Sequence, residues 1–298
     1  MNTRVIRANI LLFTAAVVWG TTFVAQRVGM DHLGPLSYTA SRFTLGALVL
    51  LPLAWMRRGQ KPPAVFGPPR PFTPVIGGLS AGLVMFAGIN LQQVGLVETT
   101  AGNAGFITGL YVVFTPLLGL LGGIRPGGGV WLGGTLGAVG LYLLSVTDQF
   151  TLRPGDGWVL ACAFCWAGHA WILGWFSPRM DSFVLAFGQT FVCAVLSWTA
   201  ALFLEPLSLS AMLAGWIPIA YGGIMSAGVG FTLQVMGQKD SPPAHAVIIL
   251  QLEAVVAAVS GWLILDESMS ARAGLGALLM LAGMLTAQLW PFKISRKS

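Results

Sequence analysis

Charged side chains are scarce in this sequence. Only 9% of its 298 residues are Asp, Glu, Lys or Arg, whereas hydrophobic residues make up 55%. An average soluble domain has about 25% charged residues, because polar groups must cover its surface. Sixteen basic and ten acidic residues cannot cover a soluble chain of this length. The composition therefore argues against a water-soluble enzyme, a disordered protein and a nucleic-acid-binding protein.

Cysteine is also rare, and the three cysteines, Cys162, Cys165 and Cys193, all lie in apolar stretches. The first two have the CxxC spacing of a redox or zinc pair. A structural zinc site needs four ligands, and no second ligand pair or polar shell accompanies these two. We interpret all three as apolar packing residues, and we expect neither a metal ion nor a cofactor.

Motifs of known enzymes are missing as well. The sequence contains no Walker A sequence, zinc signature or nucleophile elbow. An intramembrane enzyme would need a cluster of His, Asp or Ser, and only scattered candidates occur. A channel would need rings of one charge sign or a selectivity-filter loop, and neither is present. We therefore expect no catalysis, and an intramembrane enzyme or a channel is only a remote alternative.

Long apolar runs are abundant. Because the hydrocarbon core of a bilayer is about 30 Å thick, a membrane-spanning helix needs about 20 apolar residues. The chain contains ten such runs, joined by short linkers rich in Pro, Gly and charge. It is therefore predicted to be an all-α membrane protein with ten transmembrane helices. The predicted spans are Ala8–Val28, Leu33–Met56, Thr73–Val97, Ala101–Leu121, Gly128–Val146, Gly157–Phe176, Phe183–Phe203, Ala211–Met236, Ala244–Leu265 and Ala271–Trp290.

Positive charge predicts the orientation of these spans, because Lys and Arg collect on cytoplasmic loops. If the N-terminus is cytoplasmic, three basic residues, Arg27, Arg153 and Arg272, lie outside. The bias predicts a multi-pass protein of the cytoplasmic (inner) membrane with both termini in the cytoplasm. The first span is too long for the apolar part of a signal peptide, so we expect it to be retained. Twelve basic residues lie inside: Arg4, Arg7, Arg57, Arg58, Lys61, Arg70, Arg125, Arg179, Lys239, Lys293, Arg296 and Lys297.

The second half of the chain repeats the first. At an offset of 142 residues, Leu91-Gln92 aligns with Leu233-Gln234 and the following positions match without a gap. Nearer the N-terminus the offset is 147, and Trp19-Gly20 aligns with Trp166-Ala167. The repeat predicts two five-helix units, residues 1–150 and 151–298. Because five is odd, the second unit enters the membrane in the opposite orientation. Such inverted repeats are typical of secondary transporters, whose substrate sites lie near the midplane between the halves.

Short motifs in these repeats match a known pattern. They are Trp19-Gly20, Phe23-Val24 and Arg42-Phe43, then residues 99–107 with Leu110-Tyr111 and Pro116-Leu117-Leu118, and finally Leu252-Glu253-Ala254-Val255 with Asp266-Glu267-Ser268. With them the chain resembles the EamA-type members of the drug/metabolite transporter superfamily over nearly its whole length. The resemblance implies ten helices in a 5+5 inverted repeat around a central cavity formed by helices 1–4 and 6–9. It also implies solutes such as amino acids, amines, nucleobases or drugs. Ala254 departs from the family's ninth helix, which often has proline there.

Two ionisable residues lie near the middle of predicted spans. A charge at bilayer depth costs several kcal/mol unless it is paired or hydrated, so such residues are candidates for function. Arg42 lies in the second span and Glu253 in the ninth. They are expected either to pair with each other or to hold the carboxylate and the ammonium of a substrate. A helix-packing role is the alternative for Arg42. Glu253 can also carry a proton.

Other candidates are polar or aromatic residues within the spans. Histidines can shuttle protons, and we consider His245, together with Glu253, for proton coupling. Hydrogen bonding between helices is the alternative for the polar residues, and core packing is the alternative for the aromatic ones. The match of Gln92 with Gln234 in the repeat favours a structural task for both. The predicted substrate-binding residues are Trp19, Arg42, Asn90, Gln93, Asn103, Phe106, Tyr111, Trp166, His169, Gln189, His245 and Glu253.

Proline and glycine predict where the spans bend and pack. Pro116 is expected to kink the fourth span, and the glycine-rich third and eighth spans are expected to bend. Gly133-x-x-x-Gly137 in the fifth span is a spacing that also supports contacts in a dimer.

Together these features predict a secondary active transporter that exports a small organic solute by alternating access. The aromatic residues favour an apolar or aromatic amino acid, an amine or a related metabolite, with proton coupling as one mechanism. A facilitative uniporter, or an exporter of drugs or nucleobases, is the alternative. The expected partners are a small-molecule substrate and the lipid bilayer, without nucleic acid, and the chain is expected to be a monomer or a homodimer.

Overall fold

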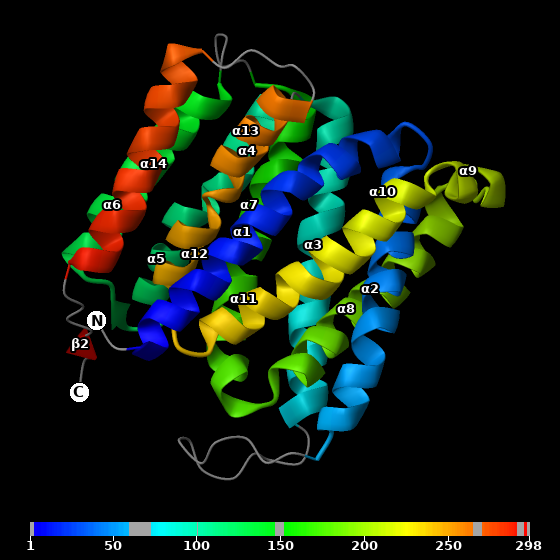
Figure 1. The fold of residues 1–298 in the computed structure, drawn as a ribbon, viewed down its shortest axis with the longest axis horizontal. Coiled ribbons are helices and arrows are strands. Elements are labelled where there is room, and N and C mark those ends of the chain that lie inside the picture. Colours follow the sequence, from blue (N-terminus) through cyan, green and yellow to red (C-terminus); the bar gives the residue numbers. More distant parts are fainter. Residues whose placement is uncertain are drawn as a thin grey trace.

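The structure is a computed structural model that describes residues 3–59, 73–99, 101–146, 152–264, 270–290 and 295–296. These residues form a bundle of helices (Figure 1). Within the described part of the chain, ten helical segments are long and apolar enough to cross a membrane. The predicted all-α membrane fold with ten spans is therefore confirmed.

The elements follow the predicted spans closely. The first five spans are α1 (Thr3–Met30), α2 (Pro35–Arg57), α3 (Thr73–Glu98), α4 (Ala101–Gly109) with α5 (Tyr111–Leu121), and α6 (Gly128–Ser145). The other five are α7 (Pro154–Phe176) with the 3₁₀ turn η2 (Ser177–Arg179), α8 (Ser182–Leu204), α10 (Trp216–Tyr221) with η3 (Gly222–Gly230) and α11 (Phe231–Gln238), α12 (Pro243–Leu250) with α13 (Glu253–Ile264), and α14 (Ala271–Leu289). The short helix α9 (Leu209–Ala214) and the two-residue strands β1 (Ile124–Arg125) and β2 (Ser295–Arg296) lie outside the spans.

The surface of the bundle is apolar, and polar groups lie inside it. Leu48, Leu83 and Leu278 are exposed on the outside of their helices, whereas Arg42 and Gln93 are buried. This distribution is the reverse of a soluble protein and suits a molecule surrounded by hydrocarbon.

The spans pack in a way that brings the two halves of the chain together. α2 packs against α8, α6 packs against α14, and α3 lies between α7 and α8. α1 contacts α13 as well as η3 and α11, which belong to the eighth span. Figure 1 shows the start of α1 and the end of α14 at the same end of the bundle. The antiparallel pairing of β1 with β2 joins the α5–α6 loop to the segment after α14.

Glycines allow α6 and α14 to approach closely. A Cβ atom at Gly133 would lie 2.6 Å from the carbonyl oxygen of Gly283, and one at Gly140 would lie 2.5 Å from that of Gly276. Such distances are shorter than any carbon–oxygen contact tolerates, so only glycine permits this crossing. The glycine spacing of the fifth span thus forms a contact within the chain, between α6 and α14.

The fourth and ninth spans are each interrupted near their middle. The Leu110 amide donates to the Ile107 carbonyl, only three residues earlier, at 3.2 Å. At Leu252, the amide bonds the Ile249 carbonyl at 3.1 Å. Both are the tighter bonds of a 3₁₀ turn. Pro116, where a kink is predicted, lies inside α5, and the interruption is a separate feature six residues earlier, at Leu110.

The eighth span contains a stretch of π-helix, η3, between α10 and α11. Its widened turns leave the carbonyl of Ser226 to accept the amide of Phe231, five residues later. π-helical turns are rare and occur mainly at functional sites. Here the stretch lies beside α1 and α2, at the level of the cavity described next.

Candidate functional site

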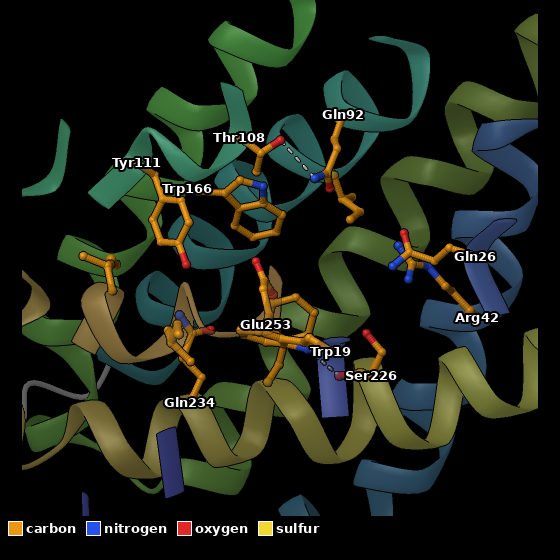
Figure 2. Close-up of a pocket in the computed structure, with 15 residues that line it drawn as sticks. Trp19, Gln26, Arg42, Gln92, Thr108, Tyr111, Trp166, Ser226, Gln234 and Glu253 are labelled. Carbon is orange, nitrogen blue, oxygen red and sulfur yellow. Dashed lines mark hydrogen bonds between the residues drawn. The ribbon is translucent and has the colours of Figure 1, made fainter. Parts of the chain in front are cut away.

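A cavity lies at the centre of the bundle, between the first and second halves of the chain. The cavity together with the open space at its mouth has a volume of about 650 Å³. Ten lining residues are labelled in Figure 2. The lining consists of Trp19, Gln26, Arg42, Ile89, Gln92, Thr108, Tyr111, Trp166, Ala170, Ser226, Phe231, Gln234, Val247, Leu250 and Glu253.

Glu253 lies in the middle of this lining. It is the first residue of α13, directly after the interruption of the ninth span. Figure 2 shows its carboxylate directed into the space beside Tyr111 and Trp166. The first turn of a helix favours negative charge, because its free amides leave a partial positive charge there. The interrupted helix thus presents an acidic group to the cavity.

Arg42 lies at the other end of the labelled set, next to Gln26 (Figure 2). Its side chain is 1% exposed. The guanidinium carbon lies 5.3 Å from the centre of the Tyr38 ring and 5.1 Å from that of Phe43. Its Nε and Nη2 atoms have no hydrogen-bond partner among the described residues. A buried guanidinium with free donors is suited to binding an anionic group.

Aromatic rings line the cavity together with these two charged groups. Phe231 lies against Trp19, with ring centres 4.8 Å apart, and is stacked on Trp166 at 6.1 Å. The Trp19 Nε1 atom donates to the Ser226 carbonyl of the π-helix at 3.4 Å. This bond fixes the Trp19 ring beside Glu253 (Figure 2). The lining therefore combines aromatic rings with an acidic group near its middle and a basic group at one end.

The remaining polar groups of the lining are neutral. Gln92 donates to the Thr108 hydroxyl at 3.2 Å, which links α3 to α4. The Gln234 Oε1 atom has no hydrogen-bond partner among the described residues. The hydrogen bond from Gln92 to Thr108 fits the structural task predicted for Gln92. Gln92 and Gln234 also line the cavity. In the part of the chain that the structure describes, no three His, Cys, Asp or Glu side chains are arranged to hold a metal ion.

The structure brings five of the twelve predicted binding residues to the cavity. These are Trp19, Arg42, Tyr111, Trp166 and Glu253. The other seven lie outside the lining, so direct contact with a solute in this cavity is not supported for them. They are Asn90, Gln93, Asn103, Phe106, His169, Gln189 and His245.

Several of these seven residues join helices. Asn90 donates to the Ser197 hydroxyl at 3.0 Å and to the Phe86 carbonyl at 2.9 Å. Phe106 packs edge-on against the Tyr142 ring. His245 and Asn103 are buried near the starts of α12 and α4. The contacts of Asn90 and Phe106 fit the interhelical packing that the sequence left as the alternative.

Sequence reasoning missed ten lining residues, among them Phe231. The repeat contained a signal for several of them. At the offset of 142, Ile89 aligns with Phe231, Gln92 with Gln234 and Thr108 with Leu250, and all six line the cavity. Matched positions in an inverted repeat are expected at a shared central site. Side chains such as Ile89 and Val247 carry no chemical signal of their own, so only tertiary structure identifies them.

Comparison with known proteins identifies the family to which the chain is similar. A model of the EamA-like transporter family matches residues 6–146 and 153–287. A protein of Archaeoglobus fulgidus named as an uncharacterized transporter is 28% identical over 292 residues, covering 95% of this chain and 86% of the relative. The uncharacterized inner membrane transporter YedA of Escherichia coli K12 is 22% identical over 263 residues, covering 87% and 83% of the two chains. A crystal structure with a TM-score of 0.77 and 21% identity has the same fold over 95% of this chain and 96% of the other.

Proposed function

Because this chain belongs to the EamA-like transporter family, we propose that it is a secondary transporter that exports a small organic solute across the cytoplasmic membrane. The solute class is an apolar or aromatic amino acid, or a related amine. Both termini are proposed to lie in the cytoplasm. The YedA relative bears a name that places it in the inner membrane, which supports this location.

One observation carries the proposal: Glu253 and Arg42 line the same cavity together with aromatic rings. An amino acid has an ammonium and a carboxylate, which these groups bind by charge-assisted hydrogen bonds. Its side chain then lies on Trp19, Trp166 and Phe231, whose ring faces also attract cations. An amine uses Glu253 and the rings alone.

The packing of the spans supports alternating access between two related halves. The contact of α3 with α7 has a counterpart in the contact of α11 with α1, and the contact of α5 with α7 has one in the contact of α13 with α1. The interruptions at Leu110 and Leu252 are separated by the repeat offset of 142 residues. Broken helices near the midplane are a common feature of transporter sites. Equivalent contacts in both halves allow the cavity to open to either side by exchange of their conformations.

Proton coupling through Glu253 is part of the proposal. A carboxylate that holds the solute's ammonium can exchange it for a proton, so that one leaves as the other binds. His245, the other residue considered for proton coupling, lies outside the cavity lining, so Glu253 is proposed for this step. A facilitative uniporter shares the same cavity and differs only in lacking this exchange.

Binding of three related probes tests the charge assignment. L-phenylalanine has both charged groups, phenethylamine lacks the carboxylate, and 3-phenylpropanoate lacks the ammonium. We expect Arg42→Gln to weaken L-phenylalanine binding about tenfold or more, because a hydrogen bond between charged groups contributes about 1.5–3 kcal/mol. It should leave phenethylamine binding unchanged. Glu253→Gln should weaken the binding of phenethylamine and leave the binding of 3-phenylpropanoate unchanged. Binding to purified protein is measured by thermal shift and equilibrium dialysis.

Asn90→Leu is the matched control, since it removes a buried amide that lies outside the cavity. It should lower stability without changing the order of the three probes. The amino acid and amine assignment is wrong if none of the three probes binds, or if both charge variants weaken all three alike. Saturable counterflow in liposomes then distinguishes a carrier from a channel, which shows no trans-stimulation, and from an enzyme, which consumes the solute.

A further inference from the structure

A buried polar pair lies just outside the cavity. The His169 Nε2 atom of α7 lies 2.9 Å from the Gln189 Oε1 atom of α8, and both side chains are 0% exposed. The His169 Nδ1 and Gln189 Nε2 atoms have no hydrogen-bond partner in the described part of the chain. Because the amide oxygen only accepts, Nε2 of the imidazole carries the proton and Nδ1 is a free acceptor. A free acceptor and a free amide donor are thus buried side by side, which costs about 1–3 kcal/mol for each unmade bond.

Two rings of the cavity lining cover this pair. The Trp166 ring lies edge-on to the His169 imidazole with centres 5.6 Å apart, and the Phe231 ring does the same at 6.2 Å. Both rings line the cavity, as does Ala170, the neighbour of His169. The pair is therefore separated from the cavity by a single layer of aromatic side chains.

Gln189 is the counterpart of Arg42 in the repeat. The two residues are separated by the offset of 147, and each lies seven positions after the start of its helix, Pro35 in α2 and Ser182 in α8. The helices run antiparallel, since Glu205 at the end of α8 accepts hydrogen bonds from Leu36 and Ser37 at the start of α2. Arg42 and Gln189 therefore lie on opposite sides of the middle of the bundle.

We propose that His169 and Gln189 form a second solute subsite, which replaces the Arg42 end of the cavity when the transporter opens to the opposite side. This inference rests on the proposed transport function. In an inverted repeat, the two halves exchange conformations as the cavity changes sides. Arg42 lines the cavity in the present state. Its counterpart Gln189 then lines the cavity in the other state, once the Phe231 ring moves away from His169.

The two subsites differ in charge, and this difference has a consequence for transport. Arg42 holds an anionic group by charge, whereas His169 and Gln189 offer one neutral acceptor and one neutral amide donor. A carboxylate is held less strongly by a neutral amide than by a guanidinium. The solute is therefore bound more weakly in the state that exposes His169 and Gln189, which favours its release to that side.

Thiol accessibility tests the subsite without a solute. In a variant with Cys162, Cys165 and Cys193 replaced by Ala, Gln189→Cys is compared with Ala186→Cys, which is equally buried in α8 but lies in an apolar cluster. Both are treated in membranes of each orientation with a membrane-impermeant methanethiosulfonate. We expect Gln189→Cys to react at least about tenfold faster, because even a minor open state of about 0.1–10% exposes it to water. Equal rates at the two positions would overturn the proposal.

Transport and binding provide the second readout. His169→Phe keeps an aromatic ring between Trp166 and Phe231 but removes the polar atoms, and His169→Gln restores a donor and an acceptor. With L-phenylalanine as the probe, His169→Phe should keep binding within about twofold and lower the maximal exchange rate about tenfold, while His169→Gln regains much of the rate. Unchanged exchange in folded His169→Phe would contradict the subsite. If wild-type protein fails to bind the probe, the proposed solute class fails instead, and the accessibility result still decides the subsite.

Discussion

At the scale of single residues, the chain places its most expensive side chains where a solute can offset their cost. Arg42 and Glu253 lie in spans, and a charge within the hydrocarbon region is unfavourable without a partner. Arg42 rests on the Tyr38 and Phe43 rings, and Glu253 begins α13, where the helix dipole favours negative charge. These surroundings stabilise both charges in part and leave both groups able to bind a ligand.

The charge of Glu253 predicts a pH dependence. Only the ionised carboxylate attracts an ammonium, so binding of phenethylamine should strengthen as the pH rises through the titration of this carboxylate. In Glu253→Gln the binding should be weak and independent of pH, because a neutral amide does not titrate. Equilibrium dialysis across a pH series measures both effects. A Glu253→Gln variant that keeps the pH profile of the wild type contradicts the role assigned to this residue.

At the scale of elements, close approach between α1 and α13 positions the site. A Cβ atom at Gly20 would lie 2.5 Å from Val256 Cβ and 2.7 Å from the Glu253 carbonyl oxygen. Trp19, which lines the cavity, precedes this glycine. The contact therefore fixes both the tryptophan and the start of α13, where the acidic group lies.

A glycine pair tests this positioning. Gly20→Ala should destabilise the protein by about 1–3 kcal/mol, because it overfills a packed contact. It should also weaken phenethylamine binding, since α13 must shift. Gly168→Ala in α7 is the control, because no atom lies within 4 Å of its Cβ position. The control should be neutral or stabilise by up to about 1 kcal/mol, because alanine has the higher helix propensity. The thermal midpoint in detergent and probe binding are measured, and equal behaviour of the two variants would refute the packing argument.

At the scale of the whole molecule, matched positions of the two halves meet at one cavity. Trp19 with Trp166, Gln92 with Gln234 and Tyr111 with Glu253 are pairs in the repeat, and all line the cavity. The last pair differs in charge, so the halves are alike in shape and unlike in chemistry. This asymmetry is what the proposed transport mechanism would use to bind the solute with different affinities on the two sides.

Ten spans predict that the two ends of the chain lie on one side of the membrane. Epitope tags at the N- and C-termini should both be protected from added protease in spheroplasts and both be cut in inside-out vesicles. Both termini are expected on the cytoplasmic side, because Lys and Arg residues collect in cytoplasmic loops. A tag exposed on each side would mean an odd number of spans and would remove the basis for the inverted repeat.

The extent of the sequence prediction differs between the fold and the site. The spans, their approximate ends and the candidates Arg42 and Glu253 could be predicted from the sequence, because long apolar runs and charges within them are easily recognised. The interruption at Leu252 was not, since neither residue of the Gln251-Leu252 turn favours a break and Ala254 is a good helix former. The interruption at Leu110 was not predicted either, because local sequence directs attention to Pro116, and proline is the usual cause of a kink.

The sequence by itself determined that this protein is a bundle of ten apolar helices made of two similar halves. Each span must satisfy its own backbone hydrogen bonds in lipid, so length and hydropathy are sufficient. Only the tertiary structure decided which polar side chains meet at the cavity and which join helices. Gln234 and Asn90 look alike in sequence as amides within spans, yet Gln234 lines the cavity and Asn90 bonds Ser197 of α8. The faces of neighbouring helices decide this, and those depend on residues far apart in the chain.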